Sequence, residues 1–89
     1  DNLNMVITDR LDTNTAPELE KEILDNIEGV KILTLDFENL MYISSAGLRV
    51  ILSAQKIMNN QGEMIIKNVN DIVMEVFTAT GFVDILNIQ

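Results

Sequence analysis

Ser44-Ser45-Ala46-Gly47-Leu48 lies where a strand pattern gives way to a helix pattern. Upstream, Val30–Phe37 is a short apolar run rich in strand-forming residues. Downstream, apolar residues recur at helical spacing, namely Leu48, Ile51, Leu52 and Met58. The two serines therefore fall at or near a helix N-terminus, where backbone N–H groups lack partners and the helix dipole is positive. A hydroxyl there can cap the helix, and the same position tolerates an added phosphate.

Outward from this stretch, strands alternate with helices along the whole chain. We expect strands over residues 3–8, 30–37 and 63–67, a last strand or an extended tail over 85–88, a turn at 9–12 and a loop over 38–43. We expect a first helix with Pro17 in its first turn and Gly29 as its stop, a second from about Ser45 to Asn59, and a third from Asn70 to Thr80. The expected inward residues of the first and third helices are Leu19, Ile23, Leu24 and Ile27, and Ile72, Val73, Val76 and Phe77.

This β-α-β-α-β-α-β order predicts an α/β fold with a mostly parallel sheet of about four strands and three helices packed on it. The chain has 89 residues, 47% of them hydrophobic, which suits a single domain over residues 1–89 with a core of its own.

Composition excludes several classes of function. A formal net charge of −8 argues against nucleic acids and anionic membrane surfaces as partners. No apolar run approaches the roughly 20 residues of a membrane span, and the sequence shows no signal-peptide pattern, so we expect a soluble, cytoplasmic domain without membrane insertion. The chain has no histidine and no cysteine, and therefore lacks the commonest general base, zinc ligand and thiolate nucleophile. We expect no cofactor, no metal and no enzymatic activity.

The central stretch resembles the core signature of the STAS domain, typified by bacterial anti-sigma factor antagonists. Residues 35–52, LDFENLMYISSAGLRVIL, match the family's strand, short apolar loop and (Asp/Ser)-Ser-x-Gly-Leu helix start. Arg10-Leu11-Asp12 and the closing Thr80-Gly81-Phe82 resemble further landmarks. The family's usual first strand and final helix have no counterpart here, which indicates a missing N-terminal strand or a minimal domain.

The resemblance implies a phosphorylation site. Aligned on Gly47-Leu48, the family's phospho-acceptor serine falls on Ser45, and Ser44 replaces a residue that is often Asp in the family. Ser44 is the second candidate acceptor. Asp9 stands where the family often has Gly. Position alone allows a plainer interpretation, in which Ser45 simply caps the helix.

We expect partner-binding residues to gather around this site, namely Asp12, Asp36, Ser44, Ser45, Ala46, Gly47, Arg49, Val50 and Ser53. Each has a structural alternative. Asp12 can serve as a turn residue or helix-entry cap, and Asp36 stands at the carboxyl end of the central strand, where α/β domains place both sites and turns. Val50, together with Ala46, Ala54 and Ile57, can belong to a wide apolar helix face that is simply buried.

The resemblance implies a regulatory binding module. The unphosphorylated form would bind an anti-sigma factor of the serine-kinase type, phosphorylation of Ser45 by that kinase would release it, and a phosphatase would reset the switch. An alternative with the same fold is a STAS scaffold or small subunit of a lipid or anion transport complex. An enzyme is the least favoured class, because Ser45 lacks a visible base partner and the chain has no phosphate-binding loop.

Overall fold

The computed structural model describes all 89 residues of the chain. In chain order the elements are β1 (Asn2–Val6), β2 (Asp9–Leu11), α1 (Ala16–Asn26), β3 (Ile32–Asp36), β4 (Leu40–Ile43), α2 (Ser45–Asn59), β5 (Glu63–Lys67), α3 (Asp71–Thr80) and a short 3-10 helix, η1 (Phe82–Asp84). The alternation of strands with helices confirms the predicted α/β class.

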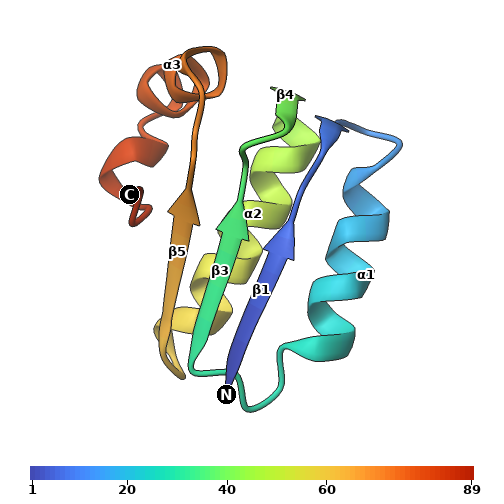
Figure 1. Cartoon of the computed structure of the whole chain (residues 1–89), viewed down its shortest axis with the longest axis vertical. Helices are drawn as coiled ribbons and strands as arrows, with labels where there is room; N and C mark the ends of the chain where they lie inside the picture. Colours follow the sequence, from blue (N-terminus) through green and yellow to red (C-terminus); the bar gives the residue numbers. More distant parts are fainter.

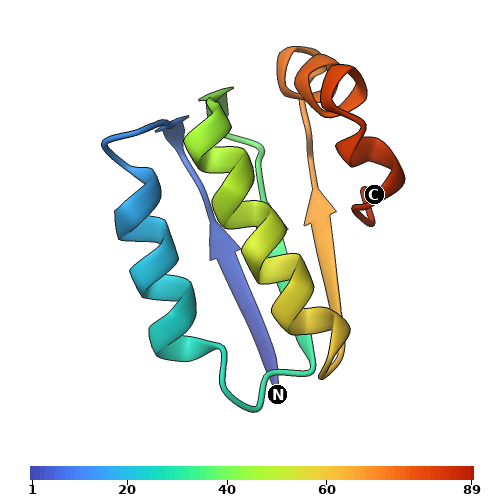
Figure 2. The same ribbon diagram turned by 180° about the vertical axis from the view of Figure 1, so that it is seen from behind.

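Strands β1, β3 and β5 form a parallel sheet with β3 in the middle. Side chains alternate between its two faces: Leu33 and Leu35 of β3 are fully buried, whereas Thr34 between them is partly exposed. Helices α1 and α2 lie against the buried face, and no helix covers the opposite face (Figures 1 and 2). Helix α3 lies beyond the carboxyl end of β5 instead of over the sheet (Figure 1).

The hydrophobic core extends past the end of the sheet toward α3. Phe37, the first residue after β3, packs on Phe77 of α3 with ring centroids 6.2 Å apart. Asn70 fixes the start of this helix, because its Oδ1 accepts a hydrogen bond from Val73 N (2.8 Å) while its Nδ2 donates to Leu40 O (2.7 Å). One side chain therefore caps α3 and ties it to β4.

Two segments predicted as irregular form a second, smaller sheet. The predicted turn at 9–12 contains β2 and the predicted loop at 38–43 contains β4, and these strands pair in parallel. Along β4 only the end residues Leu40 and Ile43 are buried, so its burial does not alternate. Because the two strands are short and lie far apart in sequence, neither produces a local strand signal, and the prediction was wrong there.

The predicted final strand over 85–88 is reduced to a single bridge. After α3, Gly81 adopts a φ of 80° and the chain enters η1. Only Ile88 then aligns with β5, through a parallel bridge to Ile66. The predicted sheet of about four strands is therefore three strands and this bridge.

Helix α2 has the predicted bounds, but two inward assignments on the other helices were wrong. Leu24 of α1 is 54% exposed and Ile72 of α3 is 60% exposed. Leu24 follows Ile23 and Ile72 precedes Val73, and both of these neighbours are buried in the core. Because adjacent helical residues point about 100° apart, Leu24 and Ile72 are turned away from the core. The buried stripes are thus narrower than the apolar sequence pattern. None of the helices combines the length and the apolar character needed to cross a lipid bilayer.

Candidate functional site

The start of α2 rests directly on the small sheet of β2 and β4. Ser44 N donates a hydrogen bond to Leu11 O of β2 (2.9 Å). A Cβ atom on Gly47 would lie 2.8 Å from both Leu11 Cγ and Leu11 O, and 2.9 Å from Ile43 Cγ1. Only a residue without a side chain fits this contact, which explains why the Ser-Ser-Ala-Gly stretch requires its glycine.

Ser44, and not Ser45, caps α2. Ser44 has extended backbone angles, its Oγ accepts a hydrogen bond from Gly47 N (3.4 Å), and its O accepts one from Leu48 N (2.9 Å). Ser45 is the first helical residue, and its exposed hydroxyl forms no hydrogen bond within the protein. The interpretation of Ser45 as the cap is therefore wrong. Of the two candidate acceptors, Ser45 presents the accessible, unengaged hydroxyl.

Asp12 organises the entry to α1. Its Oδ1 accepts hydrogen bonds from Asn14 N (2.9 Å) and Thr15 N (3.1 Å), and its own N donates to Thr15 Oγ1 (2.9 Å). The backbone N–H of Thr15, followed by that of Asn14 and by the Arg10 side chain, lowers the pKa of Asp12 below its ordinary value. The carboxylate has the structural role of a helix-entry residue while remaining partly exposed beside Arg10.

Asp36 links the loops that follow β3 and β5. Its Oδ1 accepts hydrogen bonds from Asn68 Nδ2 (3.0 Å) and Glu38 N (2.9 Å). The Asn68 amide is the main cause that lowers the pKa of Asp36, with the Glu38 N–H and the positive charge of Lys67 adding to it. Asp36 thus helps to hold the carboxyl edge of the sheet in shape.

The structure separates the expected binding residues on α2 into exposed and buried sets. Ser45, Arg49 and Ser53 are exposed and follow one another at intervals of four residues, so they form one outward stripe. Gly47 is buried against β2, and Val50 is only 7% exposed because it packs in the crevice between α1 and α2. Ala46 is half-buried. The expectation that the Val50 side chain meets a partner is therefore corrected: it belongs to the buried helix face.

Two exposed residues of the small sheet were missed by sequence reasoning. Arg10 of β2 and Tyr42 of β4 are paired across the ladder, and the Arg10 guanidinium carbon lies 4.4 Å from the centroid of the Tyr42 ring. Arg10 Nε also contacts Asp12 Oδ2 at 3.4 Å. Both residues lie within stretches that carry the STAS resemblance, but no sequence pattern shows that they meet, and only the pairing of β2 with β4 brings them together.

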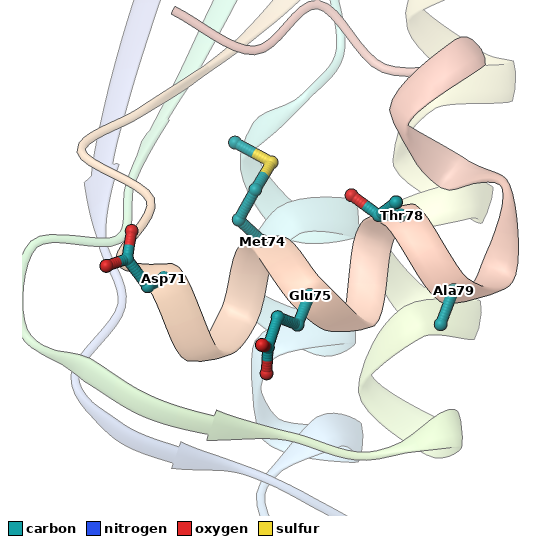
Figure 3. A pocket seen from close by; sticks show the side chains of 5 residues that line it. All are labelled: Asp71, Met74, Glu75, Thr78 and Ala79. Atoms are coloured by element: carbon teal, nitrogen blue, oxygen red, sulfur yellow. The ribbon is translucent and has the colours of Figure 1, made fainter.

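The largest depression is an open one along α3, bordered by Asp71, Met74, Glu75, Thr78 and Ala79 (Figure 3). All of its lining residues come from that one helix, and they include two carboxylates but no cation and no paired base. No group of three or more acidic side chains is placed to hold a metal ion.

The family model of the STAS domain matches residues 2–89. BtrV of Bordetella bronchiseptica, whose name describes it as an anti-sigma factor antagonist, is 40% identical over 72 residues, which cover 79% of this chain and 62% of BtrV. The chain therefore spans less than two thirds of the length of that relative.

Two solved structures share the fold. A sulfate transporter family protein from Wolinella succinogenes superposes with a TM-score of 0.83 at 20% identity, covering 97% of this chain and 71% of that one. The unphosphorylated form of the anti-sigma factor antagonist SpoIIAA superposes with a TM-score of 0.82 at 20% identity, covering 98% and 80%. At this identity the likeness establishes the fold alone.

Proposed function

Because the chain belongs to the STAS domain family, we propose that it is an anti-sigma factor antagonist controlled by phosphorylation. In this proposal the unphosphorylated protein binds an anti-sigma factor of the serine-kinase type and so frees a sigma factor for transcription. Phosphorylation of Ser45 by that kinase releases the complex, and a phosphatase restores binding. The name of the relative BtrV supports the general role.

The observation that carries the proposal is the state of the Ser45 hydroxyl. It is exposed at the first position of α2, while the neighbouring Ser44 already satisfies the cap. A phosphate on Ser45 would gain about 0.3–2 kcal/mol from the positive helix end. Arg49, one turn further on the same exposed stripe, is within reach of a charge-assisted contact. The fold should therefore tolerate the modification.

The same phosphate would be severely unfavourable at an interface. It adds a charge of about −1.5 to −2 and must be desolvated when a partner covers it. A loss of about 4 kcal/mol of binding free energy weakens a complex roughly a thousandfold. The modification can thus abolish docking while the structure of the free protein is preserved.

The decisive experiment incubates the protein with ATP and the serine-kinase-type anti-sigma factor of the same organism, then locates the phosphate by mass spectrometry. We expect phosphate on Ser45, none in Ser45→Ala, and an unchanged site in Ser44→Ala. By calorimetry, Ser45→Asp should bind this factor at least about a hundredfold more weakly than wild type with an unchanged unfolding midpoint.

Other outcomes contradict the proposal in distinct ways. Phosphate on Ser44 would move the acceptor by one residue. A Ser45→Asp variant that folds and binds as tightly as wild type would remove the switch. Capture of a membrane transporter subunit, with no binding to a kinase-type anti-sigma factor, would favour a transport-associated STAS subunit instead.

A further inference from the structure

We propose that Arg10, held on the ring of Tyr42, is a recognition residue that receives a carboxylate of the partner protein. The inference rests on the proposed function, because it concerns the surface that the anti-sigma factor would cover. It adds a contact on the small sheet of β2 and β4 to the predicted contacts around the start of α2.

The guanidinium group of Arg10 contacts two other side chains of the free protein. Its carbon lies 4.4 Å from the Tyr42 ring centroid and its Nε lies 3.4 Å from Asp12 Oδ2, although 60% of the side chain is exposed. Stacking on an aromatic ring suits the flat guanidinium and favours it over a lysine ammonium. A side chain that is already positioned loses less conformational entropy on binding than a free one.

The donors of this group remain largely unused. Arg10 uses only Nε within the protein, and neither Nη nitrogen has a protein acceptor. Asp12 Oδ1 accepts hydrogen bonds from Asn14 N and Thr15 N, and the Asp12 carboxylate meets Arg10 only through Oδ2 and Nε. The two Nη groups form the fork that matches the two oxygens of a carboxylate.

Arg10 also immediately precedes, along β2, the residue that supports the start of α2. The next residue on β2, Leu11, accepts the hydrogen bond from Ser44 N, and the residue after Tyr42, Ile43, would contact any side chain placed at Gly47. Arg10 and Tyr42 are the exposed residues immediately before these two supports of α2. Because neighbouring strand residues point to opposite faces, Arg10 and Tyr42 extend from the face of the small sheet turned away from α2, so the proposed contact requires a partner that covers both Ser45 and this outer face.

Charge indicates which partner group fits. The chain has 14 acidic and only 6 basic residues, so its overall field attracts a basic partner. A cation that is held by neighbouring side chains and has free donors on such a surface is complementary to an acidic residue at one defined point of that partner. A pair of this kind sets the register and selectivity of docking more than its overall affinity.

The test compares the binding of the kinase-type anti-sigma factor to unphosphorylated variants by calorimetry. Arg10→Glu should weaken binding at least about tenfold, as expected for an interface arginine, and Arg10→Gln somewhat less. Lys56→Glu makes the same charge change on an exposed residue in the last turn of α2 and should stay within about twofold. A charge-reversing Asp or Glu to Arg scan of the partner should find one position that restores binding to Arg10→Glu.

Each contrary result has a separate meaning. If Arg10→Glu and Lys56→Glu weaken binding equally, Arg10 acts only through the general field and the inference is overturned. If Arg10→Glu binds normally but changes how much Ser45→Asp weakens binding, Arg10 interacts with the phosphorylated Ser45 and not with a partner carboxylate. If Ser45→Asp blocks binding while both Arg10 variants bind like wild type, this inference fails alone; if the wild type binds no such factor, the proposed function fails with it.

Discussion

The hydroxyl groups of Ser44 and Ser45 lie one residue apart and have different surroundings. Ser44 Oγ accepts the N–H of Gly47, whereas Ser45 is exposed and accepts no backbone N–H. This division leaves the Ser45 hydroxyl, the proposed acceptor, free of a structural task, so a phosphate there would not remove the helix cap. Gly47, two residues after Ser45, sets how closely α2 approaches β2.

Gly47→Ala tests this close approach. In an exposed helix, Gly to Ala ordinarily stabilises by about 1 kcal/mol. Here the new Cβ would lie 2.8 Å from Leu11 O, so we expect destabilisation of about 1–3 kcal/mol in urea unfolding. Ser53→Ala, on the exposed face of the same helix, should change the unfolding free energy by less than about 0.5 kcal/mol. A stabilised Gly47→Ala would show that α2 does not rest on β2 in this way.

At the scale of elements, the short strands β2 and β4 connect parts that would otherwise be independent. They support the start of α2 through Leu11 O, and β4 holds α3 through the Asn70 amide. The N-termini of α2 and α3 and the Arg10–Tyr42 pair thus all depend on the seven residues of β2 and β4. This arrangement explains how so small a sheet can position the whole candidate surface.

Asn70 offers a test of the connection between β4 and α3. Asn70→Ala removes the cap and the hydrogen bond to Leu40 O, and should cost about 2 kcal/mol of unfolding free energy. Asn70→Ser keeps a capping oxygen but lacks the amide donor, so about half of that loss is expected. If urea unfolding shows equal losses in the two variants, the hydrogen bond to Leu40 O contributes to stability and the cap does not.

At the scale of the molecule, the candidate site residues gather at the carboxyl edge of the parallel sheet. At this edge, Asp36 links the end of β3 to the loop after β5 through its hydrogen bond with Asn68. Asp12 follows β2, and Ser45 is the first residue of α2, which rests on the small sheet. Parallel strands all end at the same edge, and the helices that follow them begin there. The architecture therefore brings residues distant in sequence onto one end of the domain.

The lowered pKa of Asp36 predicts a defined loss of stability in acid. Its ionised form is favoured in the folded protein, so its contribution is complete above the unfolded value near 3.8 and is lost as pH falls through the lower folded pKa. The difference in melting temperature between wild type and Asp36→Asn should be constant near neutral pH and shrink as pH falls below about 4. Asn68→Gly removes the main hydrogen-bond donor to Asp36, and glycine adopts the φ of 60° at this position without strain. This variant should therefore lose the same pH-dependent contribution to stability. A difference that does not vary with pH would contradict the role of this carboxylate.

Local pattern was enough to determine much of this protein. Apolar periodicity was enough to predict the α/β class and the bounds of α2. These features depend on contacts within a few residues, because helix faces, caps and strand alternation are short-range properties.

Only the tertiary structure decided how the site is built. The pairing of β2 with β4 joins segments separated by a whole helix and strand, and it alone brings Arg10 onto Tyr42 and Leu11 against Gly47. Packing against α1 buried Val50, although its neighbour Arg49 remained exposed. Such contacts depend on which elements meet in space, and no local pattern of a single sequence specifies that choice.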